Sequence, residues 1–331
     1  MRTTIAASLV FFSLIGGWTK PDRMKRPEAS PGEKMAQTLG VILLISLIVF
    51  SVLLARRNHR QGRGDREGAY RLALVVFGLL MLLFLFRGHL VPSIGTFGLF
   101  ILATSTSLCL AALTWVLYMA LEPYVRRYWP QSIISWSRLL TGRVRDPLVG
   151  SDILFGVVLG VVWIAIFQLA RILAMRLGAA PELFSPAYLS GMRPALGMWL
   201  SQIPGSIIAT LEFFFLLLGL KLVLRRDWLA AVAFVAIFSA LKSLGSSYPA
   251  IEVPTTLLVY VIAALIVFRF GLVSLACAIF TVDLLANLPF SADFSAWYMG
   301  TSTFALFSVV ALAAWGFYTS LGGEPLWKPD L

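Results

Sequence analysis

Ionisable and amide side chains lie inside several long apolar segments of this 331-residue chain. Such groups are costly in a bilayer and are candidates for transport, proton relay or catalysis. Depth can be estimated at about 1.5 Å of rise per helical residue, counted from the end of each segment that is predicted to be cytoplasmic. On this scale Lys242 lies at ~21 Å, Asp283 at ~18 Å and Gln168 at ~22 Å. Asn287 follows Asp283 by one turn on the same helix face. The sequence therefore predicts one polar layer, with an ion pair between Lys242 and Asp283.

Three interpretations of this layer stay open. The pair could hold the helices together, it could form a transport or proton-relay site, or the side chains could avoid contact and reach the outer interface. Glu212 is a separate candidate near the middle of segment 200–224. Because no cation is predicted at its depth, Glu212 is either a structural hydrogen-bonding group or a functional acid.

The sequence does not contain the ligand sets or motifs of zinc proteases or protein kinases. Its two histidines, His59 and His89, fall in loops that are predicted on opposite sides of the membrane, so they cannot share a metal ion. There is no His-Glu-x-x-His, and the glycine-rich, Val-Ala-Ile-Lys, His-Arg-Asp and Asp-Phe-Gly motifs of protein kinases are missing. Cys109 and Cys277 both lie in apolar runs, which argues against a disulfide framework or a thiolate site. We expect no metal, no cofactor and no kinase or protease activity in this chain.

Composition and block-like apolar runs predict an all-α, polytopic helical membrane protein. Hydrophobic residues make up 59% of the chain and charged residues 13%, against about 25% charged in soluble domains. About 20 apolar residues cross a bilayer as a helix. Nine segments meet or approach this requirement: 36–55, 69–86, 94–121, 153–175, 200–224, 228–244, 254–268, 271–288 and 298–320. Only Arg269, Phe270 and Gly271 separate the seventh segment from the eighth, which predicts a tight helical hairpin.

The spans divide the chain into five parts. A three-helix part (36–121) and a six-helix part (153–320) flank a basic loop (122–152), and a short tail (321–331) follows. Residues 1–35 form an N-terminal apolar segment and a Pro-rich linker. The apolar segment is a signal-anchor, a tenth membrane helix or the remnant of a larger upstream portion.

Orientation follows from the distribution of Lys and Arg between the loops. Segments 56–68, 122–152, 225–227, 269–270 and 321–331 contain 14 of them, whereas the loops on the other side contain only Arg87, Arg176 and Arg193. This asymmetry places the first group and the C-terminus on the cytoplasmic side of the membrane. The linker 20–34, with five basic residues, conflicts with this orientation. The orientation is kept because four loops and the tail together support it.

The loop 122–152 is the only cytoplasmic segment with room for structure. Ile133, Trp136 and Leu140 recur at helical spacing, and Ser132 could cap the helix that they predict. We expect an amphipathic interfacial helix in the plane of the inner leaflet. Candidates for lipid or partner contact are the basic and aromatic residues of two loops: Arg56, Arg57, Arg63, Arg126, Arg127, Trp129, Trp136, Arg138, Arg143 and Arg145.

The net charge of +11 favours anionic lipid rather than nucleic acid as the partner. The basic residues are concentrated in short loops beside apolar spans, which is typical of membrane topology and of contact with anionic headgroups. A binding partner that is nucleic acid is not expected.

Two segments resemble a known family. The stretch LEPYVRRYWPQSIISWSRLLTGRVRDPLVGSD (Leu121–Asp152) resembles part of the C-terminal polytopic membrane region of a group of bacterial serine/threonine protein kinases, as does LLARRNHRQGRGDREGAYRLA (Leu53–Ala73). A weaker similarity is seen at Leu14–Met24. The resemblance implies a membrane module that works beside a cytoplasmic kinase domain, but none of the kinase motifs can be placed on this chain.

The function that the sequence favours is a non-enzymatic sensory or anchoring module in the membrane. Its expected partners are anionic lipids and a cytoplasmic kinase or regulator. A small-solute or ion transporter that uses the Lys242 and Asp283 layer is the first alternative, and a membrane enzyme with a polar cavity is the second.

Overall fold

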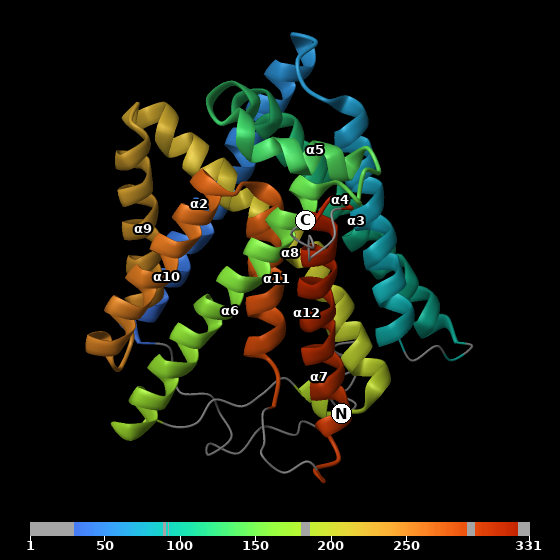
Figure 1. The fold of residues 1–331 in the computed structure, drawn as a ribbon, viewed down its shortest axis with the longest axis vertical. Coiled ribbons are helices and arrows are strands. Elements are labelled where there is room, and N and C mark those ends of the chain that lie inside the picture. Colours follow the sequence, from blue (N-terminus) through green and yellow to red (C-terminus); the bar gives the residue numbers. More distant parts are fainter. Residues whose placement is uncertain (1–29, 89–90, 92, 180–185, 290–294, 324–331) are drawn as a thin grey trace, which may run out of the picture.

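The computed structural model describes residues 30–88, 91, 93–179, 186–289 and 295–323. All regular structure in these residues is helical, and the long helices form one bundle (Figure 1). The helices are α2 (Pro31–Arg60), α3 (Arg66–Arg87), α4 (Ile94–Tyr128), the 3₁₀ turn η2 (Pro130–Ile133), α5 (Ile134–Leu140), α6 (Pro147–Arg176), α7 (Pro186–Leu189), α8 (Met192–Leu224), α9 (Asp227–Ser243), α10 (Pro249–Arg269), α11 (Leu272–Ala286) and α12 (Met299–Ser320).

Each of the nine predicted spans coincides with one helix. Seven of them, α2, α3, α4, α6, α8, α10 and α12, are long and apolar enough to cross a membrane. The helices α9 and α11 have 17 and 15 residues, fewer than the roughly 20 that span a bilayer core. The chain is therefore an all-α, multi-pass helical membrane protein. The predicted tenth helix, most of the linker and most of the tail lie outside the described residues.

The short helix α11 lies at the centre of the bundle, packed mainly against α6 and α8 (Figure 1). Glycines allow α6 to approach it closely. A Cβ atom at Gly156 would lie 2.4 Å from the carbonyl oxygen of Ser274, and one at Gly160 would lie 2.8 Å from that of Ala278. Small residues give membrane helices this kind of backbone contact.

The predicted hairpin of the seventh and eighth spans is confirmed only for its tight turn between Arg269 and Leu272. The chain turns sharply at Gly271, which has a φ of 94°. However, α10 then packs mainly on α9 and α6, while α11 enters the core between α6 and α8. The two helices separate because α11 has apolar residues on all sides and is buried by other elements.

Two helices extend further than expected at the same end of the bundle. The helix α4 continues through Pro123 to Tyr128, and α6 begins at Pro147 with Asp146 as its N-cap. The expected boundaries at 121 and 153 therefore fall inside helices. Proline at the first helical position and an aspartate cap before it are both favourable for helix initiation.

A proline inside α4 leaves one backbone carbonyl of that helix without its usual N–H donor, and a side chain of α2 supplies a donor in its place. Pro123 has no N–H for the carbonyl of Met119. The Asn58 side-chain amide donates to that carbonyl at 3.0 Å and to the carbonyl of Ala120 at 3.3 Å. In an apolar environment an unpaired carbonyl is costly, so this contact fixes the register between α2 and α4.

The described loops lie at two opposite ends of the bundle, and their division between these ends agrees with the two sides predicted from the sequence. At one end, Arg71 donates to the Leu140 carbonyl at 3.2 Å, and Trp129 donates to the Asp227 carboxylate at 3.2 Å. This basic end consists of residues 61–65, 129–146, 225–226 and 270–271, with the adjoining helix termini. At the other end, Arg193 donates to the Gly88 carbonyl at 2.7 Å.

Candidate functional site

The intramembrane residues predicted to pair do not meet. Lys242 is exposed on α9, whereas Asp283 is half-buried on α11. The helix α9 packs against α10, α8 and α2, and α11 packs against α6, α8 and α10. Within the described residues no ion pair joins Lys242 to Asp283. The predicted pair is therefore wrong, because equal depth along two helices does not bring their side chains onto facing surfaces.

The remaining intramembrane candidates make local contacts. Asn287 ends α11 and donates to the backbone carbonyl of Asp283 at 2.7 Å. Gln168 accepts from Arg171, one turn away on α6, at 3.3 Å. Glu212 is half-buried on α8. These residues lie on three different helices, and no contact between them builds a shared polar layer in the part of the chain that the structure describes.

Metal-binding residue types are also dispersed. Across the described ranges, His, Cys, Asp and Glu side chains form no group of three that could hold a metal ion. His59 is exposed at the end of α2 and its ring contacts Trp115 edge-on, with 6.3 Å between ring centroids. His89 lies outside the described residues.

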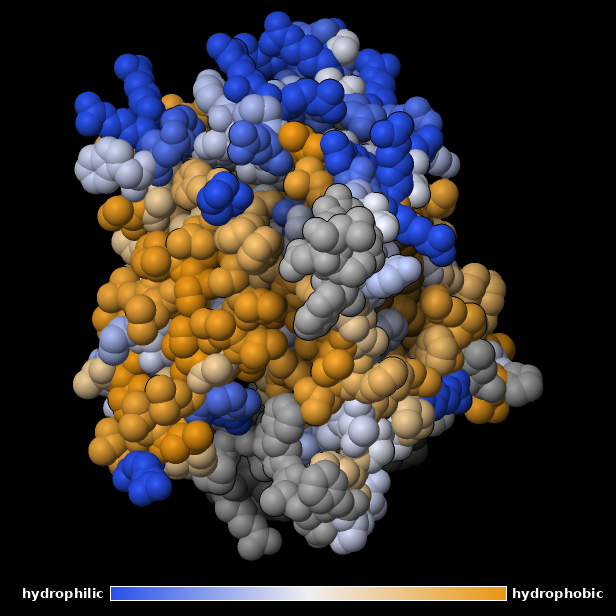
Figure 2. Space-filling view, viewed as in Figure 1, coloured by the Kyte–Doolittle hydropathy of each residue, from blue (hydrophilic) through white to orange (hydrophobic). Residues whose placement is uncertain are grey.

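Arginines from separate parts of the sequence are concentrated at the basic end. Figure 2 shows hydrophilic residues over the end that carries α5, above a broad apolar band on the same face. The exposed arginines there include residues of α2, the α2–α3 loop, α4, the α5–α6 loop and the α8–α9 turn: Arg56, Arg57, Arg63, Arg126, Arg127, Arg143, Arg145, Arg225 and Arg226. A cluster of this kind, beside an apolar band, matches the pattern by which membrane proteins contact anionic headgroups.

The segment from Trp129 to Asp146 lies across this end and is fixed to the bundle. It contains η2 and α5, so the expected helix is present. Its apolar face meets protein rather than lipid, because Ile133 and Trp136 are each only 3% exposed. The predicted contact of Trp136 with lipid or a partner is therefore wrong: its ring belongs to the core beneath α5. Trp129 is half-buried and its ring contacts Phe268, with 5.3 Å between ring centroids.

Ser132 does not cap α5 as expected. Its hydroxyl donates instead to the backbone carbonyl of Val267 in α10, at 3.2 Å. A Cβ atom on Gly271 would lie 2.4 Å from the Ser132 carbonyl oxygen, so the segment also packs tightly against the α10–α11 turn. The serine hydroxyl thus joins two segments that are far apart in the sequence.

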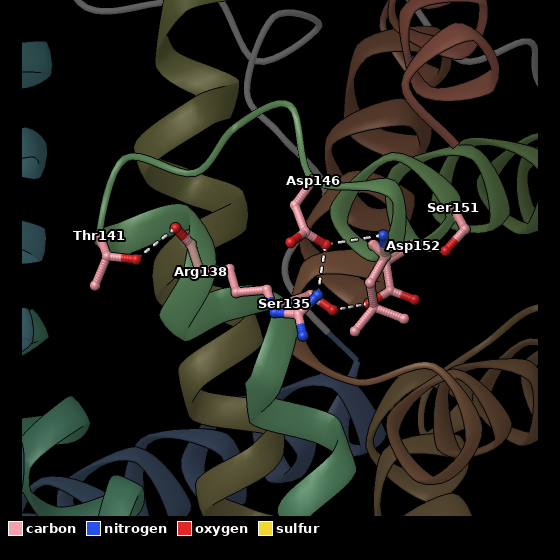
Figure 3. Close-up of polar contacts among 7 residues, drawn as sticks. Ser135, Arg138, Thr141, Asp146, Ser151 and Asp152 are labelled. Carbon is pink, nitrogen blue, oxygen red and sulfur yellow. Dashed lines mark hydrogen bonds and ion pairs between the residues drawn. The ribbon is translucent and has the colours of Figure 1, made fainter. Parts of the chain in front are cut away.

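Two carboxylates attach α5 to the start of α6 (Figure 3). The Ser135 hydroxyl donates to the buried carboxylate of Asp152, and the Arg138 guanidinium donates to Asp146 at 2.6 Å. The backbone carbonyl of Asp152 also accepts from Ser274 of α11, at 2.7 Å. These contacts connect α5, α6 and α11, and the sequence did not predict them because the serines resemble ordinary polar loop residues.

A second buried carboxylate lies where α2, α3 and α4 meet. Glu122 is 3% exposed. It pairs with Arg126 at 2.7 Å and accepts from the backbone N–H of Asp65 at 3.2 Å. The side chain of Asp65 in turn caps α3 by accepting from Gly68 at 2.8 Å. Arg126, which was expected to contact lipid or a partner, therefore also neutralises a buried acid.

The ion pair of Arg138 and Asp146 predicts a pH dependence for the attachment of α5. Partial burial alone would raise the pKa of the Asp146 carboxyl, but the hydrogen bonds from Arg138 and from the Leu148 backbone outweigh it and lower the pKa below its usual value. A carboxyl with a lowered pKa in the folded state stabilises that state at neutral pH. This contribution is lost as the pH falls through the lowered pKa.

We expect Arg138→Gln to raise the pKa of Asp146 towards that of a free aspartate, so that α5 loosens at higher pH than in the native protein. The carbon chemical shift of the Asp146 carboxyl, titrated in labelled protein, measures this directly. Arg143→Gln is the matched control, because Arg143 is exposed nearby and its titration should follow the native curve. Identical titrations in the Arg138 variant and the native protein would contradict the role given to the ion pair.

Comparison with protein-family models, with curated proteins and with solved structures gives no match for this chain.

Proposed function

We propose that this chain is a non-enzymatic sensory or anchoring module of the bacterial inner membrane. Its basic end and its C-terminus face the cytoplasm, where the arginines contact anionic lipid and a serine/threonine kinase or its regulator. The kinase part of the proposal rests on the resemblance at Leu121–Asp152 and Leu53–Ala73.

The observation that carries the proposal is the concentration of exposed arginines at one end of an apolar bundle. The opposite end has fewer basic residues among those described, with Lys34, Arg87, Arg176, Arg193 and Lys242 near helix ends there. Positive residues are retained on the cytoplasmic side during membrane insertion. The internal contacts of α5 leave Arg143 and Arg145 exposed beyond the buried face of the segment, so that they are available to a partner.

The intramembrane polar residues give the transporter alternative little support. A transport site in a helical bundle needs polar groups that converge on one position near the midplane. Lys242 is exposed at the edge of the bundle, and Asn287 serves as the C-cap of α11. The arrangement favours structural roles for these side chains.

Site-specific photo-crosslinking in living cells tests the proposed partner. A crosslinking residue at Tyr128, which is 38% exposed at the basic end, should capture a protein that carries a kinase domain or regulates one. The same residue at Trp297, which is 72% exposed at the opposite end, is the matched control and should not capture it. Replacing Arg127 and Arg143 by Glu should remove the Tyr128 product, because the docking charge is reversed while the pair between Arg126 and the buried Glu122 is kept.

Two results would contradict the proposal. One is a Tyr128 product that contains lipid alone in cells that express the candidate kinase. The other is capture of the same protein with equal yield from Trp297.

A further inference from the structure

An apolar groove of about 770 Å³ runs along the bundle between α3 and α12. Its floor is formed by α8 and α11, which contribute Trp199 and Phe280. Its mouth lies between Val75 of α3 and Phe307 of α12, which are 51% and 67% exposed. The groove therefore opens sideways, along helices that are long and apolar enough to cross a membrane.

The position of the mouth determines what can enter the groove. A lateral opening at the depth of the apolar band meets the hydrocarbon of the bilayer and not water. The volume lies within the roughly 300–1,000 Å³ typical of small-molecule sites. An extended hydrocarbon chain fits such a space and such walls, whereas a polar solute would lose its hydrogen bonds.

The groove ends at the basic end beneath α5, where a cation is available. Arg71 lines this part of the groove together with Leu139 and Leu140. One guanidinium nitrogen of Arg71 donates to the Leu140 carbonyl at 3.2 Å, and another pairs with Glu67. The Glu67 side chain is 76% exposed, so its ion pair with Arg71 is weak and a ligand phosphate could replace Glu67. The five donors of an arginine suit bidentate contact with a phosphate.

The other end of the groove lacks a charged group. The indole N–H of Trp199 donates to the Ser308 hydroxyl at 3.0 Å, so its hydrogen-bonding capacity is satisfied within the protein. The ring of Trp199 also contacts Phe280 and Phe304, with 6.1 Å and 6.0 Å between ring centroids. The far end of the groove thus suits the hydrocarbon tail of a ligand whose charge lies at Arg71.

We propose that this groove binds one acyl chain of an anionic glycerophospholipid, with the lipid phosphate at Arg71 and the chain against Trp199. The site is distinct from the exposed arginines assigned to a partner above. It would make α5, which covers the headgroup end through Leu139 and Leu140, the element that senses an occupied groove.

Quenching of tryptophan fluorescence by brominated lipids tests the site, because bromine quenches only at close contact. The protein is reconstituted in two sets of phosphatidylcholine vesicles. One set contains a minor fraction of brominated phosphatidylglycerol, and the other contains the same fraction of brominated phosphatidylcholine. The contribution of Trp199 is the difference between the native protein and Trp199→Phe. We expect half-maximal quenching of Trp199 at a severalfold lower fraction of brominated phosphatidylglycerol than of brominated phosphatidylcholine.

Two pairs of variants separate headgroup recognition from occupation by the chain. Arg71→Gln should abolish the preference for phosphatidylglycerol, whereas Arg226→Gln, at the same end but outside the groove, should keep it. Ala311→Phe fills the groove and should protect Trp199 from both lipids. Val310→Phe is the matched control, because Val310 is 57% exposed on the same helix and does not line the groove.

The proposal is overturned if Ala311→Phe leaves Trp199 as strongly quenched as in the native protein, or if Arg71→Gln keeps the full preference for phosphatidylglycerol. Native mass spectrometry of protein released from mixed bilayers gives a second readout that does not depend on tryptophan. The native protein and Val310→Phe should retain more phosphatidylglycerol than Ala311→Phe, which loses the molecule held in the groove. Equal retention by all three would also overturn the proposal.

Discussion

Replacing Gly156 by alanine should destabilise the protein by about 3 kcal/mol, a large effect for one methyl group. The added Cβ would lie 2.4 Å from the carbonyl oxygen of Ser274 and 2.7 Å from the Cβ of Cys277. Both neighbours belong to the central helix α11 and one of them is backbone, so relief requires the two helices to move apart. The free energy of unfolding, measured by titration from mild detergent into sodium dodecyl sulfate, gives the cost.

Gly219→Ala and Gly78→Ala are matched controls for this substitution. Both glycines lie within membrane helices, and a Cβ at either position would meet no other atom within 4 Å. Alanine favours a helix over glycine by up to about 1 kcal/mol, so the controls should be neutral or slightly stabilised. If Gly156→Ala behaved like the controls, the close approach of α6 to α11 would be wrong.

Asn58→Leu should cost about 1–3 kcal/mol, because it leaves the buried carbonyl of Met119 in α4 without a donor. The Asn58 amide serves the carbonyls of Met119 and Ala120, next to the gap in hydrogen bonding that Pro123 creates. The same detergent titration measures the loss. Arg57→Leu is an exposed neighbour on α2 and should have a much smaller effect.

A double-mutant cycle with Pro123→Ala identifies the cause of this loss. Alanine at 123 restores the N–H that can donate to the Met119 carbonyl, so one of the two bonds from Asn58 becomes dispensable. In the Pro123→Ala protein, Asn58→Leu should therefore cost at least about 0.5 kcal/mol less than in the native protein. Additive effects of the two substitutions would show that Asn58 does not compensate for the proline.

The helices themselves could be predicted from the sequence because apolar runs of sufficient length leave few alternatives in a bilayer. All nine predicted segments coincide with helices, and the loops occupy the two ends as their basic residues indicate. The boundaries near 121 and 153 were less accurate. Polar residues next to a span, such as Glu122 and Asp152, can extend its helix when other helices bury them.

Contacts between helices could not be predicted in the same way. Distance along a helix locates Lys242 and Asp283 at similar depths. Whether their side chains meet depends on which helices are neighbours and on how each helix is rotated about its axis. The position of α11 in the core depends on which helices have glycines facing it, and Gly156 and Gly160 look in sequence like many other glycines.

The segment around α5 shows both what periodicity can predict and where it fails. The spacing of Ile133, Trp136 and Leu140 correctly predicts a helix with one apolar face. It does not say what covers that face. Because Ser132 and Ser135 bond to Val267 and Asp152, the face is held on the bundle and is not left against lipid.

The central claim is that the basic end faces the cytoplasm, and labelling of single cysteines on intact spheroplasts tests it most directly. Cys109 and Cys277 are first replaced by alanine, and then Arg63→Cys at the basic end or Trp297→Cys at the opposite end is introduced; residues 63 and 297 are both exposed. A membrane-impermeant maleimide should label the Trp297→Cys protein in intact spheroplasts and the Arg63→Cys protein only after permeabilisation. Labelling of the Arg63→Cys protein in intact spheroplasts, with the Trp297→Cys protein protected, would contradict the orientation and the function proposed from it.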